Sequence, residues 1–542
     1  MGGCGQFGAN LTVYGHDGDW LAIDCGIGFA DDLPGVDILL PDVSWLEERA
    51  EDLKGLIITH AHEDHIGAVA WLWPRLKCPV YTTAFTAAVL RRKLMERGLL
   101  DEVEVIEFEP NKDPLQIGTF TVSALSVTHS IPETVSLMLE TDAGRVVHTG
   151  DWNLDPQPVV GQATNLDRFS EWGDAGILAV IGDSTNAPIP GRSQSESEAA
   201  KGLEKVFAEC KGKIAVTIFS SNISRIISIA NAAKANDRHV ALIGRSLKTM
   251  TQCAQEAGHI GGDIKFVSEQ DIGSLPNDKQ VMIVTGSQGE PRAALSKIAR
   301  GMSNDISLGK GDTVIFSARS IPGNERGIVD TKNLLAASGV TVIDPDQTEH
   351  TIHVSGHPRQ DELRDMLQAL KPQIVVPVHG EYQMQAAHAE LAEGEFGCGT
   401  LIPRNGYILR LSKDSGVELV DQIDITTHAL DMDRIVPVTH IPLQQRKRIS
   451  YNGAVFVSMA VNEDTLDLID LQVTPLGLID EELEGEVLET VLDRIEETYE
   501  RMKDQDRQDA KKLADTIRTA ARKPFKDQFR VRPITEVHIA YV

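Results

Sequence analysis

The sequence predicts an α/β protein in which one α/β segment is inserted into another. Short β-branched runs alternate with helical stretches through most of the chain, for example at residues 216–219 and 374–378, which is the pattern of α/β folds. Motifs rich in histidine and carboxylate lie before Asn186 and again within residues 353–381, with a long α/β segment between them. We therefore expect the chain to leave a first domain, form a second one, and return.

The N-terminal stretch favours antiparallel strands. Residues 11–14, 20–24 and 120–125 have strand patterns, and Asp17-Gly18 is a hairpin turn signal. With 542 residues, 42% of them hydrophobic, the chain is long enough for two to four packed domains.

The C-terminal part predicts a small α+β domain behind a linker. Prolines and the basic run Gln444-Gln445-Arg446-Lys447-Arg448 mark the linker. A strand is expected at 454–461, followed by a helix whose apolar residues recur at helical spacing from Val487 to Met502. A second helix at 507–523 and a final strand at 536–542 complete this domain.

Charge and cysteine content narrow the function classes. The formal net charge of −28 argues against non-specific binding of nucleic acids, because polyanions repel each other. Divalent ions bound to carboxylates would, however, reverse the sign locally. None of the six cysteines forms a CxxC pair, which is typical of a reduced, cytoplasmic protein. We expect no signal peptide and no membrane span, since the required basic and apolar stretches are missing.

The densest cluster of metal-ligand residues is His60-Ala61-His62-Glu63-Asp64-His65, directly after the apolar run 56–58. A buried strand that ends there would present imidazoles and a carboxylate in one loop, and this donor set suits zinc and similar divalent ions. His60 with His62, and Asp64 with His65, could serve two different ions. A solvated polar loop is the alternative, which the density of ligand residues disfavours.

Single residues at later strand ends extend this prediction. His129 would supply a third zinc ligand, and Asp151 can bridge two metals with its two oxygens. Asp183 is a candidate acid, base or supporting residue, and His379 is a candidate for the last ligand of the second ion. Taken singly, each of these residues would be interpreted as a structural loop residue, a helix cap or an Asx-turn. The cluster at 60–65 favours the functional interpretation.

Two groups of residues are candidates for substrate contact. The run His353-Val354-Ser355-Gly356-His357 offers small residues that can cradle a phosphate and a histidine that can donate a proton. In the inserted segment, Ser221 and Asn222 follow an apolar strand, as do residues 244–246 and 285–290. Glycines and small hydroxyl residues at strand ends suit phosphate contacts through N–H and O–H donors.

In this combination and order, the motifs resemble the metallo-β-lactamase superfamily, within it the β-CASP nucleases, and most closely the bacterial ribonuclease J family. The pattern His-x-His-x-Asp-His alone marks only the superfamily. The narrower resemblance rests on five further motifs, at residues 182–186, 285–291, 321–325, 353–357 and 379–382. It covers nearly the whole chain and is loosest in the C-terminal domain.

The resemblance implies one version of the predicted fold. A metallo-β-lactamase αββα sandwich would comprise residues 1–196 and 351–430, with an inserted β-CASP α/β domain at 197–350. A linker at 431–449 would lead to a small C-terminal α+β domain at 450–542. This last domain would support assembly into a homodimer or homotetramer.

The resemblance also implies a site. Two divalent ions, zinc or alternatively manganese, would be held by His60, His62 and His129 for the first, Asp64, His65 and His379 for the second, and Asp151 for both. Asp183 and His357 would assist proton transfer, and Asp64 would count among the catalytic residues. The run 353–357 would contact the substrate phosphate, and Ser355, Ser221 and Asn222 are candidates for a pocket that binds a 5′-monophosphate.

The implied activity is hydrolysis of RNA phosphodiesters by 5′-to-3′ exonuclease and endonuclease cleavage, in RNA maturation and decay. Water would attack phosphorus, so that the product has a 5′-phosphate. The implied partners are RNA with 5′-monophosphate ends and other RNA-degradation proteins. The implied location of the protein is the cytoplasm, with no membrane partner.

Two other function classes stay open at this point. A small-molecule metallo-hydrolase would share the metal chemistry, but it does not account for the inserted segment with its three loops of Ser, Gly and Asn. A non-catalytic RNA-binding scaffold would keep the fold and lose ligands, whereas all seven ligand positions are filled here.

Overall fold

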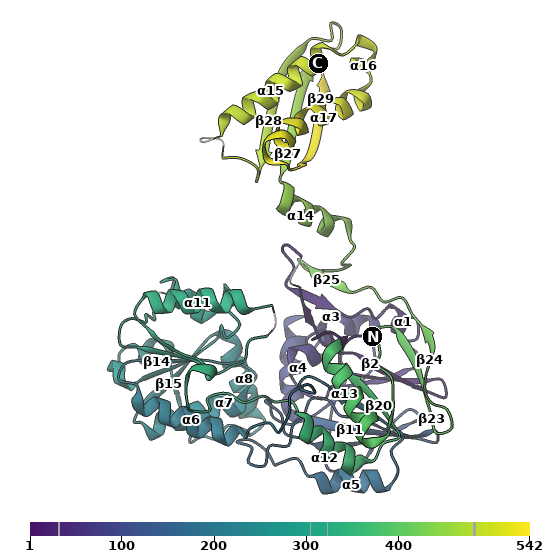
Figure 1. Cartoon of the computed structure of the whole chain (residues 1–542), viewed down its shortest axis with the longest axis vertical. Helices are drawn as coiled ribbons and strands as arrows, with labels where there is room; N and C mark the ends of the chain where they lie inside the picture. Colours follow the sequence, from purple (N-terminus) through teal and green to yellow (C-terminus); the bar gives the residue numbers. More distant parts are fainter. Residues whose placement is uncertain (31–32, 304, 322, 481–483) are drawn as a thin grey trace. The chain divides into compact units, whose positions relative to one another are not determined.

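The computed structural model describes residues 1–30, 33–303, 305–321, 323–480 and 484–542 (Figure 1). Pro322, in the motif at 321–325, and residues 481–483, in the predicted C-terminal domain, lie outside the described residues. The chain forms two compact units, one of residues 1–29 and 38–427 and the other of residues 30–37 and 428–542. In the described part of the chain, no helix is both long and apolar enough to span a membrane.

Two sheets form the centre of the first unit. The strand order is β2-β3-β6-β7-β8 in the smaller sheet and β22-β20-β13-β12-β11-β10-β9 in the larger one. The strands of the smaller sheet are β2 (Thr12–His16), β3 (Asp19–Ile23), β6 (Leu53–Ile57), β7 (Val80–Thr82) and β8 (Val105–Glu107). Those of the larger sheet are β9 (Leu115–Ile117), β10 (Phe120–Ser126), β11 (Val135–Thr141), β12 (Gly144–His148), β13 (Ala179–Asp183), β20 (Ile374–Val378) and β22 (Gly399–Thr400).

The smaller sheet begins with the predicted hairpin. β2 and β3 pair antiparallel, and between them Asp17 and Gly18 both have positive φ angles, of 50° and 90°. Two-residue hairpin turns of the matching twist require this conformation. The remaining strands of the sheet are parallel. The helices between them are α1 (Ser44–Glu47), α2 (Glu63–Ile66), α3 (Val69–Leu76) and α4 (Ala84–Glu96).

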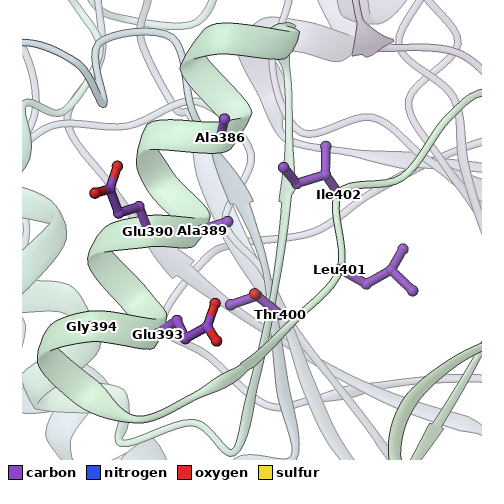
Figure 2. A pocket seen from close by; sticks show the side chains of 8 residues that line it. All are labelled: Ala386, Ala389, Glu390, Glu393, Gly394, Thr400, Leu401 and Ile402. Atoms are coloured by element: carbon purple, nitrogen blue, oxygen red, sulfur yellow. The ribbon is translucent and has the colours of Figure 1, made fainter.

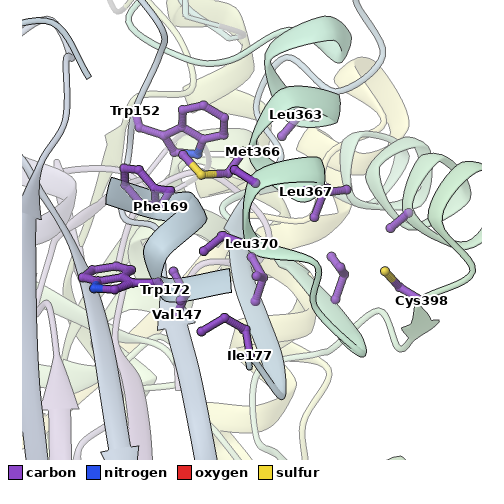
Figure 3. Packing of buried hydrophobic residues seen from close by; sticks show 14 of the residues in the cluster. Val147, Trp152, Phe169, Trp172, Ile177, Leu363, Met366, Leu367, Leu370 and Cys398 are labelled. Carbon is purple, nitrogen blue, oxygen red and sulfur yellow. The ribbon is translucent and has the colours of Figure 1, made fainter. Parts of the chain in front are cut away.

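The main core lies between the two sheets. Leu21, Ile23 and Ile57 of the smaller sheet pack against Val122 and Leu137 of the larger one. Since the larger sheet occupies this inner face, the crossover helices α3 and α4 lie on the outer face of the smaller sheet. On the outer face of the larger sheet lie α5 (Leu166–Asp174), α12 (Gln360–Leu370) and α13 (Tyr382–Phe396), packed through a cluster of aromatic and aliphatic side chains (Figure 3). The layers are therefore helix, sheet, sheet and helix, as predicted.

A second α/β segment interrupts the larger sheet. The chain leaves this sheet after β13 and returns at β20, which is the parallel neighbour of β13. Between them, parallel strands form a separate sheet with the order β16-β15-β17-β14-β18-β19. Its strands are β14 (Ile214–Thr217), β15 (His239–Ile243), β16 (Phe266–Val267), β17 (Gln280–Val284), β18 (Thr313–Phe316) and β19 (Thr341–Ile343). The longer helices around it are α6 (Glu196–Glu209), α7 (Ile223–Ala235), α8 (Arg245–Glu256) and α11 (Glu325–Ala337). The predicted α/β class and the insertion are confirmed.

The second unit has a three-stranded sheet, with the order β28-β27-β29, among its described residues. Two helices pack on one face and bury Val457, Val491, Ile495, Ile517 and Phe525. The elements are β27 (Ala454–Val461), β28 (Leu468–Leu476), α15 (Gly485–Glu500), α17 (Ala510–Phe529) and β29 (Ile534–Tyr541). The segment that we expected to be a linker forms a hairpin and a helix: β25 (His428–Asp431), β26 (Arg434–Pro437) and α14 (Ile441–Asn452).

Candidate metal centre

The loop after β6 brings the histidine run to the end of the smaller sheet. Asp24, directly after β3, holds this loop in place through hydrogen bonds to its carboxylate. Its carboxylate accepts hydrogen bonds from Thr59 N at 2.8 Å and from Thr59 Oγ1 at 3.0 Å, and it lies 2.7 Å from His65 Nδ1. A carboxylate on the second ring nitrogen directs the other nitrogen, Nε2, toward a metal. The buried Asp24 has a φ of 62°, an uncommon conformation outside glycine.

Three histidines converge with Asp151 in the first cluster. His62 Nδ1 lies 3.0 Å from His60 Nε2 and 3.1 Å from His129 Nε2. Asp151 Oδ2 lies 3.7 Å from His60 Nε2 and 3.6 Å from His129 Nε2. All four ligand atoms lie within 4.8 Å of one another, although they come from three separate loops. This spacing fits four ligands around one divalent ion.

A second cluster shares Asp151. His65 Nε2 lies 3.3 Å from Asp151 Oδ2, and His379 Nε2 lies 3.2 Å from Asp64 Oδ2 and 3.6 Å from Asp151 Oδ1. His379 follows β20 with a φ of 52°, and its N–H donates to Gly3 O at 2.9 Å. Asp151 Oδ1 is buried and has no hydrogen-bond partner among the described residues. An orphaned carboxylate oxygen between two sets of imidazoles fits a bound cation.

The pKa shifts favour the metal-binding forms of the three histidines of the first cluster and of both carboxylates, whereas the surrounding aspartates raise the pKa of His65 and His379. Burial and the nearby histidines hold the pKa of His60 well below its usual range, and similar effects lower the pKa of His62 to about 4 and that of His129 to about 3. Burial alone would raise the pKa of Asp64 and of Asp151, but the histidines around them hold both pKa values well below the usual range. Neutral imidazoles and ionised carboxylates are the forms that bind metal.

His357 and Asp183 form a pair beside the two clusters. His357 Nδ1 lies 2.8 Å from Asp183 Oδ2, and Asp183 Oδ1 accepts from Thr185 N at 2.9 Å and from Thr185 Oγ1 at 2.7 Å. Burial opposes a charge on His357, but Asp183 and Asp151 raise its pKa above the usual value. The ligand atoms of His357, Asp183, Asp151 and His379 also lie within 4.8 Å of one another. His357 therefore faces the two His/Asp clusters, and the Asp183 carboxylate beside it stabilises its protonated form.

The loop that contains His357 is held from two sides. Asn186 Nδ2 donates to Ser355 Oγ at 2.9 Å and to His357 O at 3.2 Å, and Ser193 Oγ donates to the same carbonyl at 2.8 Å. Gly356 O lies 2.7 Å from His129 Nδ1, so it orients a residue of the first cluster. A Cβ atom on Gly356 would lie 2.6 Å from that nitrogen, which explains the glycine.

The predicted substrate residues differ in their surroundings and contacts. Gly356 lies beside the first His/Asp cluster through its contact with His129, and Ser355 is the neighbouring residue, held by Asn186. His353 is packed in a cationic environment, where burial and the charges of Arg225 and Arg319 lower its pKa to about 3. Asn222 is buried and caps α7 by accepting from Arg225 N at 2.8 Å, and Ser221 precedes it in the same turn. Val354 is buried as well.

One residue that the sequence motifs did not reveal joins three loops of the site. Glu362, buried in the first turn of α12, accepts from Leu154 N at 2.9 Å through Oε1. Its Oε2 accepts from Ser193 N at 2.7 Å and from Arg359 N at 2.9 Å. The bond to Arg359 belongs to a helix capping box, a pattern that sequence inspection can find. The bonds to the loop after Asp151 and to Ser193 have no local sequence signal.

A surface cavity beside α13 lies away from these residues. It has a volume of about 540 Å³ and is lined by residues of α13, such as Glu390 and Glu393, and by residues 400–402 (Figure 2). None of the predicted ligands or substrate residues lines it. The candidate site is therefore the His/Asp cluster and not this cavity.

Comparisons with known proteins match four successive segments of the chain to models of related families. Residues 4–175 match the family model of the metallo-beta-lactamase superfamily, and residues 211–335 match "Ribonuclease J, beta-CASP domain". Residues 347–403 match "Zn-dependent metallo-hydrolase RNA specificity domain", and residues 441–542 match "Ribonuclease J C-terminal domain".

Individual relatives agree with these matches. A ribonuclease J of Sinorhizobium meliloti is 41% identical, over 100% of this chain and 96% of its own length. A ribonuclease J of Synechocystis is 35% identical over 85% of this chain and 72% of its length, and ribonuclease J2 of Bacillus subtilis is 33% identical over 86% and 84%. A crystal structure of a protein of unknown function from Enterococcus faecalis shares the fold, with a TM-score of 0.50 at 16% identity over 74% of this chain and 96% of that chain.

Proposed function

Since this chain belongs to the ribonuclease J family of metal-dependent RNA hydrolases, we propose that it cleaves RNA from the 5′ end as an exonuclease and also internally as an endonuclease. Its fold is a metallo-β-lactamase sandwich with a β-CASP insertion and a C-terminal domain. The observation that supports the proposal most strongly is the shared Asp151, one of whose buried oxygens has no hydrogen-bond partner among the described residues and lies between the two histidine clusters.

The proposed cofactor is a pair of divalent ions, zinc or alternatively manganese. One ion would be held by His60, His62 and His129, the other by Asp64, His65 and His379, and both by Asp151. Such ions activate water near neutral pH and neutralise charge on a phosphodiester in the transition state. The donor set of imidazole and carboxylate favours zinc.

The chain's own groups would then orient the substrate and move a proton. His357, whose protonated form Asp183 stabilises, is placed to donate a proton to the leaving 3′-oxygen of the RNA. Asn186 and Ser193 fix the main chain of His357, so that the imidazole keeps its position during the reaction. Because water supplies the attacking oxygen, the product has a 5′-phosphate and the 2′-hydroxyl is not the nucleophile.

Recognition of the RNA end is part of the proposal. Ser355, Ser221 and Asn222 would bind a 5′-monophosphate, together with the rest of the run 353–357. The half-buried position of Ser355 and Gly356 beside the two His/Asp clusters supports their part in this pocket, and the role of Asn222 as a cap of α7 leaves only its amide nitrogen for a phosphate.

Domain organisation, assembly and location also belong to the proposal. We place the metallo-β-lactamase core at 1–196 and 351–430, the β-CASP domain at 197–350, the linker at 431–449 and the C-terminal domain at 450–542. The family matches at 4–175 and 211–335 lie within the first core segment and the β-CASP domain, whereas the C-terminal match begins at residue 441, inside the proposed linker. We further propose a homodimer or homotetramer in the cytoplasm, in contact with other RNA-degradation proteins.

Two substitutions test the roles of the site residues. Asp64→Ala should lose both bound metal and RNA hydrolysis. His357→Gln should keep its metal, because His357 is not assigned as a ligand, while kcat falls about 10²–10⁴-fold, the usual contribution of a general acid. His538→Gln, an exposed position in the second unit, is the matched control. Full activity with normal metal content in Asp64→Ala, or loss of metal in His357→Gln, would contradict the proposed roles.

A further inference from the structure

Basic residues gather in two segments of the second unit, although the chain as a whole is acidic. The helix α14 contains Arg446, Lys447 and Arg448 and no acidic residue, in a chain of formal net charge −28. Residues 516–533, from the middle of α17 to the start of β29, contain six basic residues and a single acidic one, Asp527. Because α14 packs against β29, these two segments lie together in the fold.

Two arginines of α17 donate hydrogen bonds from Nε to the residues at the start of β29. Arg518 Nε donates to Thr535 O at 3.1 Å, and Arg522 Nε donates to Pro533 O at 3.1 Å and to Thr535 Oγ1 at 3.2 Å. The two side chains are four residues apart on the helix and therefore point the same way. In the described part of the unit, the terminal nitrogens of Arg522 form no hydrogen bond or ion pair, whereas Arg518 also pairs with Asp515.

Arg448 of α14 adds a third cation. Its side chain is exposed and forms no ion pair with any residue that the structure describes. Burial and the positive charges of Arg518 and Arg448 lower the pKa of Arg522, and Glu536 is the acidic group that acts in the opposite direction. The positive charges of Arg518 and Arg448 thus act on Arg522 in the same direction, and a bound anion would offset them.

Protection of a sheet edge explains only part of this arrangement. β29 lies at the edge of its sheet, and bonds from Arg518 and Arg522 to its first residues cover that edge. Such protection is common, but it requires neither Arg448 nor the near absence of acidic residues from both segments. Tyr451, one turn after Arg448 and 73% exposed, adds an aromatic ring to the same helix. Cationic forks beside an exposed ring are the usual contacts of single-stranded RNA.

We propose that Arg448, Arg518 and Arg522, together called the arginine ridge, bind phosphates of single-stranded RNA outside the catalytic centre. Tyr451 would stack on a base of the same strand. This inference rests on the proposed function, since it takes RNA as the substrate. The ridge would increase the affinity for long RNA without taking part in hydrolysis.

Binding of RNA to the full-length chain in EDTA tests the ridge without any cleavage. The probe is a fluorescein-labelled oligouridylate, and its anisotropy is measured at several salt concentrations. We expect Arg448→Ala and Arg522→Ala each to weaken binding several-fold. Each phosphate contact that is lost should lower the slope of log affinity against log salt by about 0.7. Tyr451→Ala should weaken binding with little change in that slope.

Arg501→Ala is the matched control, because Arg501 is an exposed arginine of the same unit that already pairs with Glu497 at 3.1 Å. It should bind RNA as the unchanged protein does. If Arg522→Ala lowers the thermal midpoint of unfolding, its weaker RNA binding could reflect lost stability. The RNA affinity of Arg448→Ala then tests the proposal, because the Arg448 side chain makes no hydrogen bond in the described structure. Equal RNA affinities of Arg448→Ala and Arg501→Ala would overturn the proposal. So would polyglutamate binding that depends on Arg448 while RNA affinity stays unchanged, because the partner would then be an acidic protein.

Hydrolysis of a 5′-phosphorylated trinucleotide separates this proposal from the proposed function. A trinucleotide fills only the catalytic site, so Arg448→Ala should hydrolyse it at the unchanged rate. If the unchanged protein does not hydrolyse the trinucleotide, the proposed function fails, while the binding result in EDTA still supports or overturns the ridge.

Discussion

At the scale of single residues, the Glu362 carboxylate accepts three backbone N–H groups from separate loops of the metal centre. One of these loops follows Asp151, another contains Ser193, and the third follows His357. A buried carboxylate that loses such bonds leaves unsatisfied donors, each of which costs about 1–3 kcal/mol. We infer that Glu362 positions the loops of the candidate site, although none of its hydrogen bonds in the described structure goes to an assigned metal ligand or to His357.

We expect Glu362→Gln to lower kcat while KM for a short RNA and the metal content change little. The amide keeps the size of the side chain, but its nitrogen would face an N–H donor, so the loops around His357 shift. Single-turnover kinetics and metal analysis by mass spectrometry are the measurements. Glu390→Gln, an exposed change on α13, is the control. Loss of metal in proportion to activity, or an unchanged kcat, would show that Glu362 does not position these loops.

Sequence patterns predicted the residue types of the site better than their partners. The spacing of His60, His62 and Asp64 predicts a metal-binding loop, because ligands that are close in sequence are also close in space. The partners of Glu362 could not be predicted, since Leu154 and Ser193 are 208 and 169 residues away. Asn222 illustrates a different limit of prediction from sequence, because a polar residue between a strand and a helix can serve either as a helix cap or as a phosphate contact.

At the scale of elements, an ionic contact joins the sandwich to the inserted β-CASP segment. Glu133, in the loop after His129, accepts from Phe85 N at the start of α4 at 2.7 Å, and it lies 2.7 Å from His259 Nε2, just after α8. Arg92 of α4 also pairs with Glu256 of α8 at 2.6 Å. Burial alone would raise the pKa of Glu133, but the bonds from His259 and Phe85 lower it below the usual value.

This pKa shift predicts how stability depends on pH. Because the pKa of Glu133 is lower in the folded state, its contribution is complete above the ordinary pKa of a glutamate. The contribution is lost as the pH falls through the folded-state pKa. Glu133→Gln should therefore lower the free energy of unfolding by about 1–3 kcal/mol near neutral pH, and by less in acid.

Urea unfolding followed by tryptophan fluorescence measures this difference, since all six tryptophans belong to the first unit. Glu109→Gln, an exposed position, is the control and should have no effect at either pH. A difference between Glu133→Gln and the unchanged protein that is the same at pH 7 and pH 4 would contradict the assigned interaction.

At the scale of the whole molecule, the order of the motifs predicted the insertion. Residues of one centre lie on both sides of the segment 197–350, and β13 and β20 are indeed parallel neighbours in one sheet. Strand order and register could not be predicted, because the apolar runs of a buried parallel sheet look alike. The helix α14 was also missed, since Pro442 and the polar residues after it suggested a linker. Proline in the first turn of a helix is, however, well tolerated.

The most direct test of the account follows the 5′ end of one RNA. The purified chain, with its bound metal quantified, is incubated with a 5′-labelled RNA that has either a monophosphate or a triphosphate. We expect two divalent ions per chain and release of labelled mononucleotide, faster from the monophosphate and absent in Asp64→Ala. Intact RNA in the presence of two bound ions per chain would contradict this expectation.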